Sequence, residues 1–563
     1  MLFRSKNLLN FIRDNYSKGK SDLATTFLYK FGVLENHKTY TCVSPHNWLY
    51  QISYKKLRDS LLRSNKIRFL IELGQRPFQN PIGSEVILII LNNGCDNFWG
   101  VDLTKCEGAS ENKDNLLSNS LNLIGKADLL KDKELRIVQQ KRENDLPKLE
   151  SYAKSYVGIL NGDTPRFIFC FWEIPIINKK WEFIQSTVNT RQLYSGRSNI
   201  ILWENGNGSL RNLAIQLKDK LHNADRRGSQ AWEKNGIAVS QMGSLNTSLY
   251  SGNYFDSNLA VILPDKKEYL IPIWCFCNSQ DYYNEVRKID KNKKVTNATL
   301  VKVPFSINFW ENVAKEQFPN GLPSPYSDDL TQWLFHGQPI KSDQTLQVAI
   351  SRLLGYRWPA ESDAEMELSD EARELIRDIK RFDHLSDIDG IICIPSVSKE
   401  ETAANILRDY LKEIFKENWD TNTIQQLLEK ENARSTNLEG WLRNEFFIQH
   451  CKVFQNSPFI WHIWDGRNDG FSALVNYHKL NKENLTKLIY TYLGDWIRMC
   501  EIKKKAEVSG AEGLLSAAQK LKEKLELILE GEAPYDIFVR WKTLEEQPIG
   551  WDPDLNDGVR LNI

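Results

Sequence analysis

Apolar residues recur at helical spacing near the start of the chain, at Leu23, Phe27, Phe31 and Leu34. This spacing places them on one face of a predicted helix. Ser21 and Asp22 precede the first of them, and either can cap the helix. The stretch "SYKKLRDSLLRSN" predicts a second helix, capped by Ser53, with Tyr54, Leu57 and Leu61 on one face.

Three stretches between and after these helices have the length and apolar character of strands. They are "KTYTCVSP", "IRFLIELG" and "SEVILIILNN". The last two are almost continuously apolar, which is typical of strands in a sheet that is covered on both faces. Residues 1–94 are therefore expected to form part of an α/β sheet.

The remaining chain divides into three segments by its pattern. Residues 95–150 are polar and are predicted to be an insertion or connection. Residues 151–330 contain short strand-like runs, including "RFIFCFWEIPII", "SNIILWENGNGS", "LAVILPDKKEYLIPIWCFC" and "ATLVKVPF", so we expect a mixed α+β domain. Residues 331–563 show mainly helical apolar spacing and are predicted to be a helical domain.

Composition narrows the class of protein. The 563 residues are 41% hydrophobic and 26% charged, which is typical of soluble globular proteins of several domains. The 73 basic and 73 acidic side chains cancel, so any contact with nucleic acid must be local. The nine cysteines contain no CxxC pair, which favours free thiols over a metal site. Without a signal-peptide pattern or an apolar stretch of membrane-spanning length, we expect a cytoplasmic protein with no membrane partner and no metal.

Motifs of the common enzyme classes are absent from the sequence. It has no Walker loop, HExxH, GxSxG or GxGxxG. The string "ENGNGSL" is predicted to be a turn. The string "HIWDGRNDGF" brings His462, Asp465, Arg467 and Asp469 together, and a loop tied by charge-assisted hydrogen bonds is favoured over a hydrolytic or metal site.

Two stretches carry a local excess of positive charge. One runs from residue 197 to 234 and includes Arg226 and Arg227. The other is "RKIDKNKK", with five basic residues: Arg287, Lys288, Lys291, Lys293 and Lys294. Both stretches have two interpretations, a solvated surface or a set of contacts to nucleic-acid phosphates.

One aromatic residue lies in an unexpected place. Phe78 sits in "GQRPFQNPIGS", the turn between the two long apolar strands, where a polar residue is usual. From the pattern alone, Phe78 is a turn residue that folds back onto the core.

Several long strings resemble one family along essentially the whole chain. They are "YSKGKSDLATTFL", "CVSPHNWLYQISYKKLRDSLL", "LGQRPFQNPIGSEVILIIL", "GIAVSQMGSLNTSLYSG", "PNGLPSPYSDDLTQWLFHGQP", "FIWHIWDGRNDGFSALVNYHKL" and "YDIFVRWKTLEEQPIGWDPDLNDGVRLNI". The family is that of bacterial adenine-N6 DNA methyltransferases of the γ class, which occur in BREX-type phage defence and in fused type II restriction–modification systems.

The resemblance implies a fold, a cofactor and a DNA partner. Residues 1–94 would be the distal part of an S-adenosylmethionine (SAM)-dependent methyltransferase sheet, residues 151–330 a target-recognition domain, and residues 331–563 a helical domain. The enzyme flips an adenine out of duplex DNA and stacks it on an aromatic residue. The resemblance assigns this role to Phe78, and it makes the seven basic residues named above candidates for contacts to DNA.

The resemblance also indicates that elements are missing. The glycine-containing turn that holds SAM and the Asn/Asp-Pro-Pro-aromatic turn that holds the adenine amino group do not occur in the sequence. The nearest string, "PSPY" at Pro323–Tyr326, has Ser324 at the position of the first proline. We therefore expect the C-terminal part of an enzyme, with no catalytic residue of its own, inactive alone and acting with an N-terminal methyltransferase fragment or other defence-system subunits. The alternatives are a non-enzymatic DNA-specificity or interaction subunit beside a separate catalytic chain, and an inactive remnant.

Overall fold

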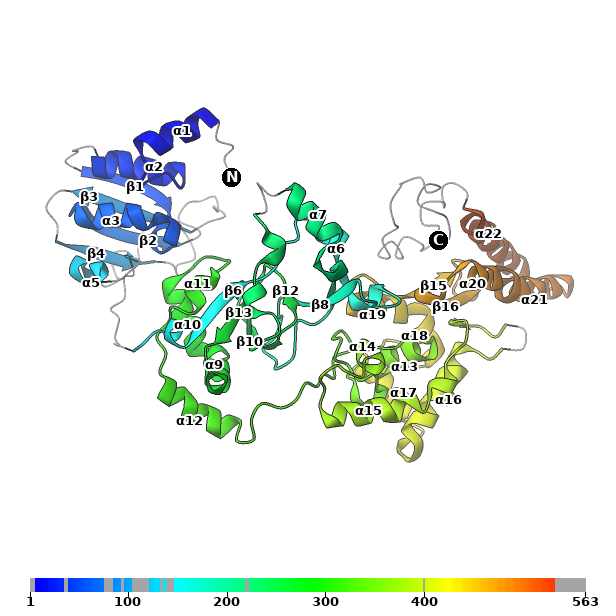
Figure 1. The fold of residues 1–563 in the computed structure, drawn as a ribbon. Helices are drawn as coiled ribbons and strands as arrows, with labels where there is room; N and C mark the ends of the chain where they lie inside the picture. Colours follow the sequence, from blue (N-terminus) through cyan, green and yellow to red (C-terminus); the bar gives the residue numbers. More distant parts are fainter. Residues whose placement is uncertain are drawn as a thin grey trace. The chain divides into compact units, whose positions relative to one another are not determined.

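The computed structural model describes residues 6–34, 39–74, 85–92, 96–103, 121–131, 135–137, 146–217, 222–397 and 400–531. The chain forms two units. Unit 1 comprises Met1–Ser155, Gln241–Leu245 and Pro264–Ala314, and unit 2 comprises Tyr156–Ser240, Asn246–Leu263 and Lys315–Ile563. Both units are mixed α/β, with small sheets and many helices (Figure 1). These units cut across the domain boundaries predicted at residues 94, 150 and 330, which stay predictions.

A five-stranded sheet in the order β1-β3-β2-β4-β5 forms the centre of unit 1. Strand β3 is antiparallel to both β1 and β2, and β4 is parallel to β2, so β1, β2 and β4 run in one direction. The three strands predicted within residues 1–94 are confirmed, and the segment predicted to be a polar connection adds β4 and β5. The strands are β1 (Thr39–Pro45), β2 (Ile67–Gly74), β3 (Val86–Asn92), β4 (Asn97–Asp102) and β5 (Asn122–Gly125).

The helices of the N-terminal part of unit 1 cover this sheet (Figure 1). They are α1 (Lys6–Asn15), α2 (Leu23–Tyr29), the π-helical turn η1 (Lys30–Leu34), α3 (Lys55–Arg63) and α5 (Lys126–Leu130). Asp22 is the cap of α2, because its side chain accepts a hydrogen bond of 2.7 Å from the backbone N–H of Thr25. Ser53 is not the cap of α3, since Tyr54 occupies the position before its first residue. Leu57 and Leu61, predicted to share one face of this helix, are both buried.

The apolar stripe of the first predicted helix is not its core face. The side chains of α2 that are buried are Thr25, Thr26, Leu28 and Tyr29. Phe27 of the stripe is 50% exposed and Leu34 is 52% exposed. The threonines can be buried because both hydroxyls donate to the backbone carbonyl of Gly19, at 3.1 and 2.9 Å. Phe27 and Leu34 of the stripe therefore stay outside the core of this chain.

The second part of unit 1 is helical, where the sequence predicted strands. It consists of α9 (Leu270–Cys277), α10 (Gln280–Ile289), α11 (Asn297–Leu300) and α12 (Ile307–Gln317), the last of which crosses into unit 2. The run "LIPIWCFC" is apolar on every side and is buried in α9, and such a run has no period that separates a helix from a strand. The expected strand "ATLVKVPF" contains the short helix α11 instead.

Unit 2 contains three further sheets, with strand orders β11-β10-β13-β6, β12-β8-β9-β7 and β14-β16-β15. Strand β6 is the point at which the chain passes from unit 1 into unit 2. The strands are β6 (Ala153–Val157), β7 (Ile168–Cys170), β8 (Trp181–Gln185), β9 (Asn199–Leu202), β10 (Asn235–Ser240), β11 (Thr247–Ser251), β12 (Tyr254–Phe255), β13 (Leu259–Pro264), β14 (Ile391–Cys393), β15 (Ile460–Trp464) and β16 (Ser472–Asn476).

Helices dominate the C-terminal part of unit 2, as the apolar spacing predicted. Among its buried residues are Trp358 and Trp441, which belong to one large core cluster. The helices of unit 2 are α6 (Thr164–Phe167), α7 (Ser209–Gln216), α13 (Thr345–Leu353), α14 (Pro359–Ser362), α15 (Asp370–Lys380), α16 (Ala403–Phe415), α17 (Thr423–Lys430), α18 (Leu438–Asn444), α19 (Phe446–Val453), α20 (Lys482–Lys487), α21 (Leu493–Lys505) and α22 (Ala511–Glu530).

The loop "HIWDGRNDGF" is tied by hydrogen bonds, as predicted. Asp465 accepts from the backbone N–H groups of Arg467, at 3.1 Å, and Phe471, at 2.9 Å. His462 lies on β15, where burial lowers its pKa to about 4. The described part of the chain contains no group of three or more side chains that could hold a metal, no disulfide among its cysteines, and no helix long and apolar enough to cross a bilayer.

Candidate functional site at one edge of the N-terminal sheet

The strand directions bring several strand ends of unit 1 to one edge of the sheet. Strands β1, β2 and β4 finish there, at Pro45, Gly74 and Asp102, and the antiparallel strand β3 begins there, at Val86. Binding sites of open α/β sheets commonly lie beyond the carboxyl ends of parallel strands. We call this the carboxyl edge, and its side chains are the candidate site.

A lysine from the second part of unit 1 bridges two carboxylates at the carboxyl edge. Nζ of Lys291 lies 2.6 Å from Oε2 of Glu72, on β2, and 2.9 Å from Oδ2 of Asp102, on β4. Burial raises the pKa of Glu72 despite the lysine beside it. Burial lowers the pKa of Lys291, but the two carboxylates outweigh it and hold that pKa above its usual value. The charge of Lys291 is therefore neutralised within unit 1.

A second group of contacts joins the start of β3 to the same lysine segment. Nδ1 of His46 lies 2.8 Å from Oε2 of Glu85, an ion-pair distance without hydrogen-bond geometry. The other ring nitrogen, Nε2, is 3.3 Å from Oδ1 of Asn292. The ring of Tyr50 packs edge-on against His46, and burial, with Asp290 nearby, raises the pKa of its hydroxyl. These contacts attach the segment around Asn292 to the edge at a second point.

Asp290 gives this segment its shape. Its side chain is fully buried and accepts from the backbone N–H groups of Asn292, at 3.1 Å, and Thr296, at 3.3 Å. Arg287 closes the same turn by donating to the carbonyl oxygens of Asn292 and Gly243, at 2.5 and 2.8 Å. Burial raises the pKa of Asp290. This is typical of a carboxyl group that is removed from solvent.

Some of the basic residues predicted to contact DNA make contacts within the protein, and others are exposed to solvent. Of those in unit 1, Arg287 and Lys291 make the internal contacts described above. Lys288 is exposed and lies 2.6 Å from Glu285, and Lys293 and Lys294 are also exposed. The structure therefore leaves three exposed lysines on a segment that is fixed at the carboxyl edge.

Arg226 and Arg227 belong to unit 2, whereas the other five basic residues belong to unit 1. Arg226 donates to the carbonyl oxygen of Gly206, stacks on Trp203 at 5.1 Å, and lies 3.6 Å from Asp225. Arg227 is exposed. Their contact with DNA stays a prediction.

Phe78 falls outside the described residues, in the interval 75–84. The described strands on either side end and begin at the carboxyl edge, at Gly74 and Val86. Its assignment as the residue that stacks on adenine stays a prediction.

Sequence analysis missed the acidic and aromatic members of the site. Glu72 and Asp102 are carboxylates within or at the end of apolar strands, "IRFLIELG" and "NFWGVD", and a charge in such a run is unusual. These two charges in apolar runs could have identified Glu72 and Asp102 as candidates from the sequence. The pairing with Lys291 was not predictable, because more than 180 residues separate it from both partners.

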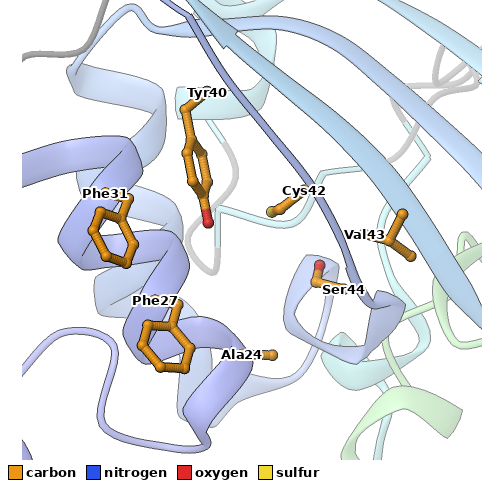
Figure 2. A pocket seen from close by; sticks show the side chains of 7 residues that line it. All are labelled: Ala24, Phe27, Phe31, Tyr40, Cys42, Val43 and Ser44. Carbon is orange, nitrogen blue, oxygen red and sulfur yellow. The ribbon is translucent and has the colours of Figure 1, made fainter.

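A pocket of about 490 Å³ lies beside β1, on the face that α2 and η1 cover. Figure 2 shows its lining side chains, which come from the helix and from the strand: Ala24, Phe27, Phe31, Tyr40, Cys42, Val43 and Ser44. The rings of Phe27 and Phe31 are stacked, with centroids 6.0 Å apart, and Phe31 stacks on Tyr40 at the same distance. None of the described side chains that line this pocket is charged. These side chains therefore offer no charged partner for the carboxylate and ammonium groups of SAM.

Comparison with known proteins gives a match to solved structures only. No family model matches the chain, and no curated protein matches it. The chain is similar to a nuclease-deletion mutant of the Type ISP restriction–modification enzyme LlaGI in complex with a DNA substrate mimic. The identity is 12%, the TM-score is 0.37, and the match covers 58% of this chain and 40% of that one.

Two further matches are also structures with DNA. The Type IIL restriction–modification enzyme MmeI in complex with DNA has 11% identity and a TM-score of 0.34, over 67% of this chain and 51% of that one. The DrdV–DNA complex has 10% identity and a TM-score of 0.34, over 57% of this chain and 43% of that one. The chain thus spans about half the length of these structures or less.

Proposed function

We propose that this chain supplies the DNA-recognition part, and part of the catalytic sheet, of an adenine-N6 DNA methyltransferase of a restriction–modification or phage-defence system. The sequence resemblance motivates the proposal. In such an enzyme the SAM-binding turn and the Asn/Asp-Pro-Pro-aromatic turn are required, and polypeptide outside this sequence would provide them. The methyl donor would be SAM, and the other polypeptide would hold most of it.

One observation carries the proposal. The lysine segment 287–294 is fixed, through Lys291, to the edge of the sheet from which the connection with Phe78 departs and to which it returns. An enzyme that flips a base must hold the phosphates of the duplex close to the site that receives the base. Exposed lysines on a segment that is fixed at this sheet edge would meet this requirement. Lys291 itself would position the segment, while Lys288, Lys293 and Lys294 would contact phosphates.

The ion pairs of Lys291 give a prediction about stability. Lys291→Met is expected to destabilise unit 1 by about 1–3 kcal/mol at neutral pH, because it leaves the buried carboxylate of Glu72 beside Asp102 without a cation. The pKa of Glu72 in the folded protein is already above its usual value. Without the lysine the pKa of Glu72 in the folded protein rises further, so protonation of Glu72 stabilises the folded variant more than the folded wild type. The penalty is therefore smallest in acid and grows as the pH rises through the pKa of Glu72 in the folded variant.

Melting temperatures of the wild type and the variant, measured from about pH 5 to about pH 8, check this prediction. Lys288→Met is the matched control. It removes an exposed lysine 2.6 Å from Glu285, a pair of the kind that contributes at most about 1 kcal/mol. A penalty for Lys291→Met that is independent of pH would contradict the assignment of the uncompensated charge to Glu72.

The exposed lysines give a prediction about DNA. Lys293→Glu combined with Lys294→Glu is expected to weaken binding to all duplex sequences alike, and to reduce the slope of log K against log salt by about 0.9 for each lost phosphate contact. Fluorescence anisotropy at several salt concentrations measures both effects. Lys520→Glu with Lys524→Glu, two exposed residues of α22, is the charge-matched control. A loss confined to one preferred sequence would mean that these lysines contact bases.

The absent turns give a prediction about SAM. The purified chain is expected to give no saturable binding signal with SAM in the micromolar range. It lacks the family's glycine-containing turn for the cofactor, and the described side chains that line its apolar pocket are uncharged. Calorimetry measures this directly. A saturable signal would show that the chain holds SAM by itself.

Methyl transfer tests the proposed function as a whole. The chain is mixed with the polypeptide that carries both missing turns, and the incorporation of labelled methyl groups at N6 of adenine in duplex DNA is measured. Transfer that requires both components is the expected result. Transfer by the other polypeptide at an undiminished rate and with undiminished sequence preference, without this chain, would overturn the proposal.

A further inference from the structure

A loop of unit 2 closes on itself between β8 and β9. These two strands are antiparallel, and the loop that joins them spans residues 186–198. Its two sides meet at a neck, where the backbone N–H of Ser186 donates to the carbonyl oxygen of Gly196 at 2.9 Å. Gly196 has a φ of +74°, and a Cβ at this position would lie 2.4 Å from the carbonyl oxygen of Ser186. The neck therefore requires glycine.

Polar side chains from the end of β10 and the start of β11 hold the first side of this loop. Ser240, the last residue of β10, is buried, and its hydroxyl oxygen accepts from the backbone N–H of Val188 at 2.8 Å. The side-chain amide of Asn246, directly before β11, donates to the carbonyl oxygens of Val188 and Asn189 at 3.3 and 2.5 Å. These bonds satisfy the backbone of the loop and fix its path.

Strand β11 holds the second side of the same loop. The backbone N–H of Leu249 donates to the carbonyl oxygen of Leu193 at 2.8 Å. The hydroxyl oxygen of Ser248, which is fully buried, accepts from the backbone N–H of Ser195 at 2.8 Å. Both sides of the loop are therefore fastened to one pair of strands. Residues 189–192 lie between the two sets of bonds and form the tip of the loop.

The tip has the side-chain chemistry that matches base edges. Its four residues, Asn189, Thr190, Arg191 and Gln192, are all exposed. Residues 187–195, "TVNTRQLYS", include one basic residue and no acidic one, so the tip suits a polyanion. A guanidinium group donates two parallel hydrogen bonds to O6 and N7 of guanine, and a side-chain amide donates to N7 of adenine while it accepts from N6. Lysines, as on the segment 287–294, act as point charges that suit phosphates instead.

We propose that the tip of this loop reads base edges in the major groove of duplex DNA, with Arg191 on a guanine and Gln192 on an adenine of the neighbouring base pair. The inference rests on the proposed function and names the residues that give it a sequence preference. Arg191 and Gln192 are the longest side chains of the tip and reach furthest from its backbone. Paired hydrogen bonds to a base require a side chain held in one place, and the bonds on both sides of the loop provide this.

Selection of bound sequences from a library of randomised duplexes, with the full chain, measures the base preference. Arg191→Lys keeps the charge and removes the two parallel donors. It is expected to lower the preference for guanine at one position by about ten- to a hundredfold, with the slope of log K against log salt unchanged. Gln192→Glu is expected to change the preferred base at the neighbouring position from adenine to cytosine, because a carboxylate accepts from the cytosine amino group and cannot donate to N7.

Two variants make the same exchanges elsewhere in unit 2. Arg377→Lys lies on α15 and Gln426→Glu on α17, and both residues are exposed. They match the test variants in charge and in chemistry, so they should leave the base preference unchanged. All four variants should melt like the wild type, because exposed side chains contribute little to folding stability.

Each other outcome has a definite meaning. A sequence preference that both tip variants leave unchanged overturns the inference and leaves the proposed function standing. Equal weakening on every sequence would mean that the tip contacts the DNA backbone, and this also overturns the inference. A changed preference without methyl transfer by the reconstituted enzyme counts against the proposed function and not against the inference. A wild-type chain that prefers no sequence, alone or with the polypeptide that carries the two turns, overturns both.

Discussion

Arg352→Met is expected to lower the free energy of unfolding of unit 2 by about 3–5 kcal/mol. Arg352 and Glu361 are 1% and 2% exposed, and their side chains approach to 2.5 Å. The second terminal nitrogen of Arg352 lies 2.7 Å from Asp383. Burial lowers the pKa of Arg352, but the carboxylate of Glu361 outweighs this and raises it. Removing the arginine leaves the carboxylate of Glu361 buried without a cation, and burying an unpaired charge is costly.

A double variant isolates the charge effect. Arg352→Met with Glu361→Gln removes both buried charges, so it should lose less stability than the sum of the single variants. Hydrogen exchange of the buried backbone of α13 in the native protein measures the local free energy of opening. Lys412→Met is the control. Its partner Asp409 is 3.0 Å away, but both side chains are about half exposed or more, and such a pair contributes at most about 1 kcal/mol. Additive losses in the double variant would contradict the argument.

Phe78→Ala is expected to slow methyl transfer by roughly ten- to a hundredfold in the enzyme reconstituted from this chain and the polypeptide with the two turns. A base stacked on an aromatic side chain contributes about 1–3 kcal/mol, as measured by alanine substitution. An increase of about 1.4 kcal/mol in the activation free energy slows a reaction tenfold. The effect should fall on activity and leave the melting temperature unchanged.

Phe78→Trp distinguishes stacking from packing. A stacking surface tolerates a larger ring, so this variant should keep its activity and its melting temperature. A phenylalanine packed in a core would behave differently. Truncation to alanine would then cost about 3–5 kcal/mol of stability, and enlargement to tryptophan would also destabilise the protein. If both variants melt early and lose activity in proportion, Phe78 is a packing residue.

The sequence by itself determined several local elements within residues 1–94 of unit 1. Apolar runs of strand length gave β1, β2 and β3, and helical spacing with Asp22 before it gave α2. These elements follow from short-range physics, because a cap, a period and a strand-length run are all encoded within a few residues. The loop at Asp465 was also predictable, since its hydrogen-bond partners lie within six residues.

Only the tertiary structure decided which faces and partners these elements use. Helix α2 buries Thr25 and Thr26 because Gly19 satisfies their hydroxyls, and this leaves the apolar stripe with Phe27 exposed. Lys291 has the same sequence character as Lys293, yet it is neutralised by Glu72 and Asp102 while Lys293 faces solvent. Both outcomes depend on contacts between segments that the local sequence does not join, because burial and charge pairing are set by the packed chain.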